Sequence, residues 1–182
     1  MSYSQAKQDL FVLEQTKDKH NGLFLEIGGN AATSDGNNTY LLESQYNWNG
    51  ISIELDPRYN YSWQTRTAKY FNMNALDFDY EDELTKLCGE NSNTIDYLSL
   101  DLDPPDITYE CLMKIPFDKF NFSVITYEHD RYRVGDKYRN WSRKYLLGLG
   151  YTLKVADVRC PSPDLYGNIG SEFEDWYIKE KL

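Results

Sequence analysis

The residues of this chain with the clearest chemical potential stand where an apolar run breaks at two glycines. Residues 23–27 are mostly apolar, as in a buried strand, and the polar segment 31–38 follows the glycines. Because glycine has no β-carbon, backbone amides at such a turn can approach a bound ligand closely. We expect a ligand cradle here, with contact residues Glu26, Gly28, Gly29 and Asn30. The simpler alternative is a strand followed by an ordinary glycine turn.

A further carboxylate follows the next apolar run. Residues 50–53 lead into Glu54, at the strand end where open α/β sheets bind their ligands. A carboxylate can accept hydrogen bonds from both hydroxyls of a ribose, although a solvated acid is the alternative. The cradle lacks the GxGxxG spacing, and segment 31–38 is longer than a turn that grips a pyrophosphate. These features favour a ligand such as S-adenosylmethionine over a dinucleotide.

Three acidic residues lie at the end of another apolar run. Residues 95–102 resemble a buried strand, and Asp101, Asp103 and Asp106 lie at its carboxyl end. Like charges raise one another's pKa unless a cation, a substrate amine or a metal compensates them. The crowding therefore favours a functional site, and a solvated acidic loop is the alternative.

A histidine between two acids ends the apolar run 120–127. In a parallel sheet Glu128, His129 and Asp130 should lie beside the carboxyl end of 95–102. The imidazole of His129 could deprotonate a hydroxyl near neutral pH, or an acid could simply hold it to lock the strand end. The two strand ends also offer candidate ligands for a divalent cation such as Mg²⁺: Asp101, Glu128 and His129.

Alternating helical and strand-like segments position these residues. Ser4 can cap a first helix whose apolar face carries Ala6, Leu10 and Leu13. The predicted helices are 4–17, 39–46, 80–88, 107–115 and 138–147. The predicted strands are 23–27, 51–55, 69–73, 95–102, 120–127, 151–156 and 173–178. The last two strands have no helix between them, which suggests an antiparallel edge.

This pattern predicts one α/β domain that spans residues 1–182. The expected fold is Rossmann-like, of the class I methyltransferase type: a mostly parallel seven-stranded sheet with an antiparallel last strand and helices on both faces. A dinucleotide-binding sheet would instead end with another βαβ unit. The N-terminal helix, within residues 1–20, is expected to cover the cofactor site.

The composition of the chain bears on its cellular location and on its binding partners. The chain has 182 residues, no apolar run of membrane-spanning length and no basic start followed by an apolar run, so we expect a cytoplasmic protein. Cys88, Cys111 and Cys160 are too far apart for a CxxC motif, which favours reduced thiols. The net charge of −10 disfavours a nucleic-acid partner.

Seven sequence blocks together resemble the FkbM-type methyltransferases. They are SQAKQDLF at 4–11, NGLFLEIG at 21–28, NTYLLE at 38–43, WNGISIE at 48–54, IDYLSLD at 95–101, VITYEH at 124–129 and EDWYI at 174–178. The resemblance implies S-adenosylmethionine as cofactor and O-methylation of a hydroxyl on a small molecule or saccharide. It also implies that Gly28, Glu54 and Asp101 hold the cofactor and that Asn74 and Ala75 flank its adenine.

The expected chemistry is direct transfer of the sulfonium methyl group to a hydroxyl. His129 would be the base, Asp101 would fix the cofactor's amine or a cation, and Glu128 would orient either of them. Loops usually carry specificity. The expected acceptor-binding residues are Gln8, Asp103, Arg131 and Tyr132.

Two departures from the family pattern keep other functions open. The family's Asp-x-Glu-Gly-x-Glu is Asp-Leu-Asp-Pro-Pro-Asp at 101–106, which stiffens the loop and leaves the roles of Asp103 and Asp106 undecided, and the run 31–37 is insertion-like. The Asp103-Pro104-Pro105 sequence also resembles the motif of amino-group methyltransferases of nucleic-acid bases, without the aromatic residue that follows it. A non-catalytic nucleotide-binding or interaction module is the third alternative.

Overall fold

The computed structural model of this protein describes residues 1–33, 36–89, 92–161 and 170–180. All seven strands form one sheet in the order β3-β2-β1-β4-β5-β7-β6. The strands are β1 (Leu23–Ile27), β2 (Asn49–Glu54), β3 (Lys69–Asn72), β4 (Thr94–Leu100), β5 (Asn121–Glu128), β6 (Thr152–Arg159) and β7 (Glu172–Ile178). Strand β7 is antiparallel to both of its neighbours, and the pairs among the first five strands are parallel.

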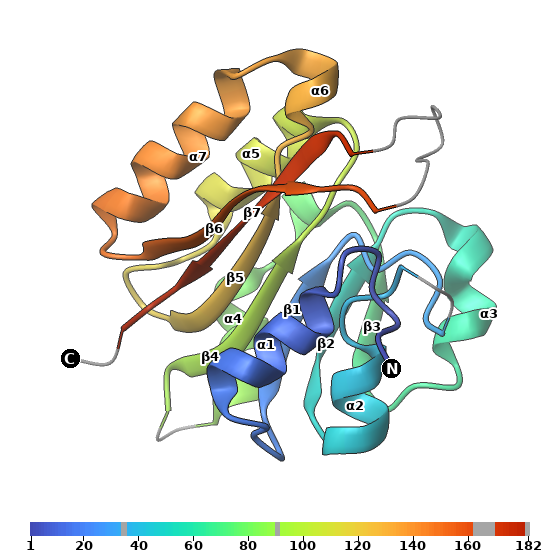
Figure 1. The fold of residues 1–182 in the computed structure, drawn as a ribbon. Coiled ribbons are helices and arrows are strands. Elements are labelled where there is room, and N and C mark those ends of the chain that lie inside the picture. The colour runs from blue at the N-terminus through green and yellow to red at the C-terminus, as the bar shows by residue number, and fades with distance from the viewer. Residues whose placement is uncertain (34–35, 90–91, 162–169, 181–182) are drawn as a thin grey trace.

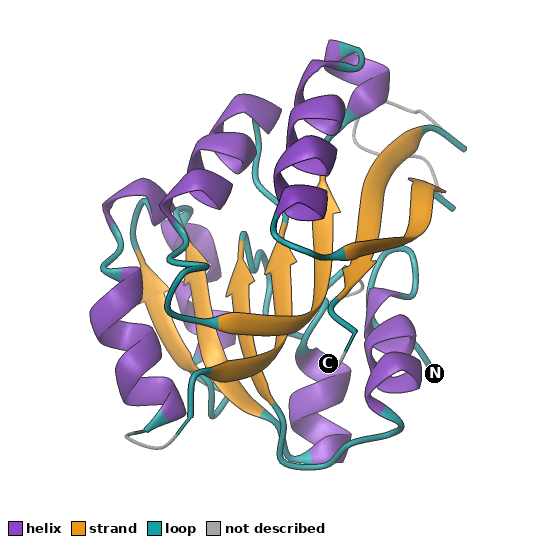
Figure 2. Ribbon diagram, turned by 90° about the vertical axis from the view of Figure 1, so that its left-hand side faces the viewer, coloured by secondary structure: helices purple, strands orange, loops and turns teal. Residues whose placement is uncertain are grey.

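Helices cover both faces of this sheet (Figures 1 and 2). They are α1 (Gln8–Thr16), α2 (Tyr40–Tyr46), α3 (Asn60–Trp63), α4 (Tyr80–Cys88), α5 (Pro105–Lys114), α6 (Arg131–Val134) and α7 (Lys137–Gly148), with the 3₁₀ turns η1 (Pro57–Tyr59) and η2 (Ala75–Asp77). This is the predicted Rossmann-like class I methyltransferase fold. The sequence did not indicate α3, α6 or the two 3₁₀ turns, each of which is only three or four residues long.

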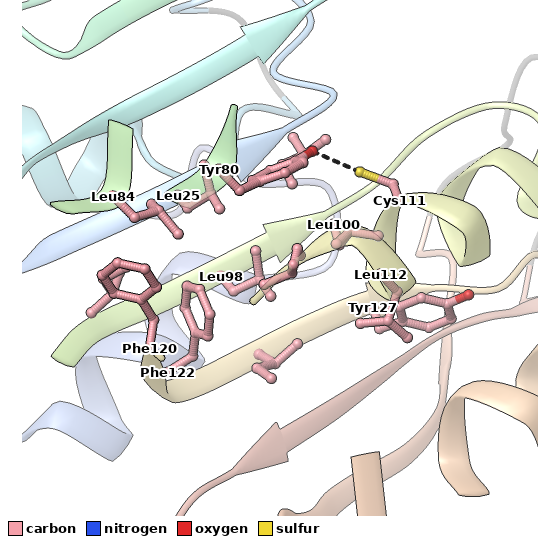
Figure 3. Packing of buried hydrophobic residues seen from close by; sticks show 14 of the residues in the cluster. Leu25, Tyr80, Leu84, Leu98, Leu100, Cys111, Leu112, Phe120, Phe122 and Tyr127 are labelled. Carbon is pink, nitrogen blue, oxygen red and sulfur yellow. Dashed lines mark hydrogen bonds between the residues drawn. The ribbon is translucent and has the colours of Figure 1, made fainter. Parts of the chain in front are cut away.

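Two hydrophobic clusters attach the helices to the sheet. One packs α4, α5 and α7 on one face through residues such as Leu84, Leu112 and Leu146, and Figure 3 shows part of it. Within it the hydroxyl of Tyr80 lies 2.9 Å from the Sγ atom of Cys111. The other cluster packs α1 and α2 on the opposite face. Together they fix the strand ends, because burying one large apolar side chain contributes about 1.5–3 kcal/mol.

The first helix differs from its prediction. It begins at Gln8 with Lys7 as its N-cap residue, and Ser4 contacts its first turn from outside: the Ser4 hydroxyl accepts a hydrogen bond from the Asp9 amide (3.2 Å) and donates one to the Asp9 carboxylate (2.8 Å). Leu10, expected on the apolar face, is 38% exposed, whereas Gln8 and Asp9 are fully buried. The prediction placed the wrong face of this helix against the core, because Gln8 and Asp9 are buried with hydrogen-bond partners where apolar residues were expected.

The end of the chain matches its prediction. The last two strands form an antiparallel pair at one edge of the sheet, with β7 next to β5 and β6 outermost. The three cysteines are free thiols, as expected. In the described part of the chain, every helix is too short or too polar to cross a membrane.

Candidate functional site

A cavity of about 1160 Å³ opens at the carboxyl ends of β1, β2, β4 and β5. The residues that line it from these strand ends are Gly28, Asn30, Glu54, Asp101, Glu128 and Asp130. Small-molecule sites commonly have volumes of about 300–1,000 Å³, so this cavity can hold a nucleotide-sized ligand and a second small molecule. Its position is the one at which open α/β sheets bind ligands.

The glycine turn is shaped first by contacts between strands. Gly28 has φ +85°, and a β-carbon on it would lie 1.7 Å from the carbonyl oxygen of Asp101. A β-carbon on Gly29 would lie 2.3 Å from the Ser52 hydroxyl. Gly28 lines the cavity, whereas Gly29 packs against β2. Only glycine allows this close approach of β1 to β2 and β4, which places the turn at the cavity.

Glu26 supports the cradle from behind. It is 2% exposed and lies outside the cavity lining, where its Oε2 atom accepts a hydrogen bond from the Ser52 hydroxyl (2.9 Å). Burial raises the pKa of Glu26 to about 7, although the Arg66 guanidinium opposes the shift. Glu26 therefore links β1 to β2, and of the four predicted cradle residues only Gly28 and Asn30 line the cavity.

Glu54 lies where the sequence predicted it and already binds the backbone. Its two carboxylate oxygens accept hydrogen bonds from the amides of Asn30 (2.8 Å) and Asp56 (2.7 Å). Asn30 adopts φ +49° in this contact, a conformation that asparagine tolerates. A carboxylate has about four acceptor positions, so Glu54 can still bind two ligand hydroxyls.

Asn74 and Ala75 line the same cavity, between β3 and η2. The Asn74 side chain accepts a hydrogen bond from the amide of Leu76 (3.0 Å) and so caps η2. Asn74 therefore has a structural role, and both residues line the cavity that Glu54 also lines.

The side chains of Asp101, Glu128 and Asp130, which we call the carboxyl trio, lie at the ends of β4 and β5. Glu128 lies between the other two, and burial followed by these neighbours raises its pKa well above its ordinary value. Burial also raises the pKa of Asp101. Asp130 is 1% exposed; its Oδ2 atom accepts a hydrogen bond from Arg133 (2.6 Å), while its Oδ1 atom has no donor among the described residues.

The predicted acceptor residues separate in the structure. Asp103 and Tyr132 line the cavity, and Asp103 is ion-paired with Arg133. Arg131 lines a neighbouring cavity of about 400 Å³, where Asp136 and Glu172 hold it. Gln8 is fully buried and donates a hydrogen bond to Glu174 (2.9 Å). The geometry thus supports two of the four residues, because β7 covers Gln8 and an ion-pair network holds Arg131.

His129 does not face the cavity. Its side chain is fully buried, with Nδ1 accepting a hydrogen bond from the Arg131 amide (3.2 Å) and Nε2 lying 3.6 Å from Asp175. Arg143 of α7 donates to both carboxylate oxygens of Asp175 (2.7 and 2.8 Å), and Asp157 lies against the same guanidinium. The geometry therefore favours the simpler expectation, a histidine that an acid holds at the strand end.

Of the expected metal ligands, Asp101 and Glu128 lie together, but His129 lies with Asp157 and Asp175 instead. Among the described residues, the group with three ligand atoms within 4.8 Å of one another consists of His129, Asp157 and Asp175. Arginine side chains already occupy it, since Arg139 also donates to Asp157 (2.8 Å). The group of His129, Asp157 and Asp175 is therefore a cluster of ion pairs with arginines. It is not the Mg²⁺ site that the sequence predicted.

Residues 2–5, before α1, line the cavity, and Ser2, Tyr3 and Ser4 were not predicted as site residues. The carboxylate of Asp9 holds this segment, accepting hydrogen bonds from the Ser2 hydroxyl (2.6 Å) and the Tyr3 amide (2.7 Å). Gln5 donates to the Sγ atom of Cys160 (3.1 Å). The sequence feature that could have indicated this contact is Asp9, an acid a few residues after Ser2 and Ser4. The segment before α1, rather than the helix itself, lines the predicted cofactor site.

Comparisons with known proteins give a fold but no family. No known protein family matches the sequence, and a search of curated proteins finds no relative. Among solved structures, a precorrin-6y C5,15-methyltransferase from Geobacter metallireducens is 13% identical, with a TM-score of 0.56 and coverage of 94% of this chain and 87% of that chain.

Two other solved structures have the same architecture. A S-adenosylmethionine-dependent methyltransferase from Archaeoglobus fulgidus is 13% identical (TM-score 0.51; 95% of this chain and 94% of that chain). A 1,6-didemethyltoxoflavin-N1-methyltransferase from Burkholderia thailandensis, solved with S-adenosylhomocysteine, is also 13% identical (TM-score 0.53; 96% and 77%). The sheet order, the cavity at the strand ends and these likenesses together give this chain the class I methyltransferase fold.

Proposed function

We propose that this protein is a S-adenosylmethionine-dependent O-methyltransferase of the FkbM type that acts on a hydroxyl of a small molecule or saccharide. One observation carries the proposal: the cavity brings the cradle, Glu54 and the carboxyl trio to one edge of a sheet with this fold. The fold likeness supports the cofactor, and the seven sequence blocks support the reaction class.

The residues present fit this cofactor. Carboxylates are suitable acceptors for ribose hydroxyls and for an ammonium group, and both kinds of contact are offered along one cavity wall. The residues proposed to hold the cofactor are Gly28, Asn30, Glu54, Asn74, Ala75 and Asp101, all of which line the cavity. When bound, S-adenosylmethionine supplies an electrophilic methyl group.

The chain's own contribution is positioning and proton removal. Holding donor and acceptor in one cavity supplies much of the rate gain in such a transfer. We assign the base role to Glu128 instead of His129. Burial and the neighbouring carboxyls raise its pKa, and a cationic cofactor bound at Asp101 favours its ionised form, which can then accept the proton of the acceptor hydroxyl.

The amino-group alternative is less well supported by the contacts. It needs Asp103 to accept hydrogen bonds from an exocyclic amine, but Arg133 already pairs with Asp103. The fourth position of the motif is Asp106, which lies outside the cavity lining.

Calorimetric titration with S-adenosylmethionine, S-adenosylhomocysteine and NAD tests the proposal. We expect binding of the first two and none of NAD. Glu54→Ala should weaken that binding by about tenfold or more, because it removes the ribose acceptor. Glu110→Ala, a matched change at an exposed position of α5, should not alter it. A wild-type protein that binds neither S-adenosyl compound would refute the proposal.

A further inference from the structure

The charges on the cavity wall do not balance. Among the described residues, its lining contains two guanidinium groups, those of Arg58 and Arg133. Each is ion-paired, Arg58 with Asp56 and Arg133 with Asp103 and Asp130. The carboxyls in the described part of the lining number six: Glu54, Asp56, Asp101, Asp103, Glu128 and Asp130. S-adenosylmethionine brings a sulfonium and an ammonium against one carboxylate, so acidic charge remains in excess after it binds.

Within this acidic wall, one oxygen of Asp130 lacks a donor among the described residues. The carboxyl of Glu128 contacts both Asp101 and Asp130, but one proton on Glu128 can be donated to only one of them. Asp130 is only 1% exposed, yet its Oδ1 atom has no donor among the described residues. A buried acceptor without a partner costs about 1–3 kcal/mol, so a ligand donor would relieve that cost.

The cavity that Asp130 lines also contains aromatic residues. The amide of Asp130 donates a hydrogen bond to the carbonyl of Phe173 (3.0 Å), which places β7 against it. Phe173 and Tyr132 line the same cavity. Aromatic faces attract cations, so a buried acid in a cavity that aromatic residues line favours a cationic nitrogen over a neutral hydroxyl.

We propose that the acceptor carries a cationic nitrogen, as in an amino sugar or amino alcohol, and that Asp130 Oδ1 binds this nitrogen while a neighbouring hydroxyl is methylated. The inference rests on the proposed function and adds the substrate class. The cofactor ammonium is assigned to Asp101, on β4, and the acceptor cation to Asp130, after β5. The protein thus uses adjacent carboxyls for two different ligands.

Binding of matched amines to the cofactor-loaded protein tests the assignment. Protein saturated with S-adenosylhomocysteine is titrated, with EDTA present, with glucosamine, 2-aminocyclohexanol and ethanolamine and with their N-acetylated counterparts, which keep the hydroxyls and lose the charge. We expect at least one amine to bind about tenfold more tightly than its acetylated partner. Equal binding within every pair, or no binding by any amine, overturns the inference.

Two variants localise the effect. Asp130→Asn keeps the shape, tolerates the φ of +43° and should abolish the preference for the amine. Asp118→Asn, an exposed position near the opposite end of β5, should preserve it. Retained preference in Asp130→Asn overturns the inference. Loss of S-adenosylhomocysteine binding in the wild type would instead refute the proposed function, so the two failures are distinguishable.

Discussion

Two acidic clusters diverge at the end of β5 and differ in what neutralises them. The carboxyl trio faces the cavity, and the pKa values of Asp101 and Glu128 are raised. The other cluster, which we call the arginine-bound cluster, comprises His129, Asp157 and Asp175 with Arg139 and Arg143. There burial opposes ionisation, but Arg143 followed by His129 holds the pKa of Asp175 well below its ordinary value.

The comparison shows how to separate structural from functional acids in one fold. Acids that form ion pairs with arginines of a neighbouring helix have their partners inside the protein, and these pairs hold the strands and the helix together. Acids left without enough donors at a cavity keep an interaction available for a ligand. Residues 128–130 contribute to both clusters, so position in the sequence alone does not assign the role.

Removal of Arg143 should produce the largest change. Arg143→Met leaves Asp175 and Asp157 short of a cation, and breaking such a buried pair costs about 3–5 kcal/mol. Urea denaturation should therefore show a large loss in the free energy of unfolding. Arg58→Met, at an exposed pair where one side chain is 80% exposed, should change it little. Equal effects of the two variants would contradict the distinction between the clusters.

The pH dependence of stability should have opposite signs at the neighbouring acids Glu174 and Asp175 of β7. Burial raises the pKa of Glu174 to about 8, above the ordinary value of 4.5, so the folded state binds its proton more tightly. The resulting stabilisation is complete below about pH 4.5 and is lost as pH rises through about 8; its size is on the order of 5 kcal/mol. Asp175 has a lowered pKa, so its contribution is present above the ordinary value and is lost as pH falls.

Glu174→Gln isolates the first of these terms, because glutamine keeps the shape and does not titrate. The free energy of unfolding should fall more steeply from about pH 5 to about pH 8 in the wild type than in this variant. The exposed control Glu110→Gln should follow the wild-type curve. Parallel curves for Glu174→Gln and the wild type would show that Glu174 ionises normally.

Neutralising a member of the carboxyl trio should affect ligand binding rather than folding. Asp101→Asn relieves repulsion from its neighbours, so the free energy of unfolding should stay level or rise. Affinity for S-adenosylmethionine should fall by about tenfold, or about 1.4 kcal/mol, because the ammonium loses its charged acceptor. Calorimetry and urea denaturation of the same samples would measure both, and a destabilised variant with full affinity would contradict the assignment.

Substitution of His129 should have a smaller effect, confined to stability. His129→Asn keeps an acceptor for the Arg131 amide, so the loss should be about 1 kcal/mol. Once an acceptor is known, the variant's kcat should keep the wild-type dependence on pH. A kcat that loses its pH dependence between about pH 6 and 9 would restore His129 as the base.

Chelation should have the smallest effect of all. Arginines rather than a metal neutralise the arginine-bound cluster. Exhaustive EDTA treatment should therefore leave both the melting temperature and S-adenosylmethionine binding unchanged. A drop in either after chelation, reversed by Mg²⁺, would show that one of the clusters holds a metal.

The sequence by itself determined the local elements and the strand-end residues. Helix α4 (Tyr80–Cys88) has the predicted bounds, because acids in its first turn and Gly89 after it mark both ends. The apolar runs predicted all seven strands, and the glycine turn, Glu54 and Asp101 lie at the cavity as expected. These features follow from neighbours along the chain, which is why a pattern can reveal them.

Only the tertiary structure decided what each strand end faces. Insertion of β7 between β5 and β6 brings Asp175 and, through α7, Arg143 to His129, and it buries Gln8 against Glu174. These partners are 32 to 166 residues apart in sequence, for Arg143 with Asp175 and Gln8 with Glu174 respectively. Because successive side chains of a strand point to opposite faces, neighbouring acids at one strand end can serve either packing or the site, and long-range partners alone determine which.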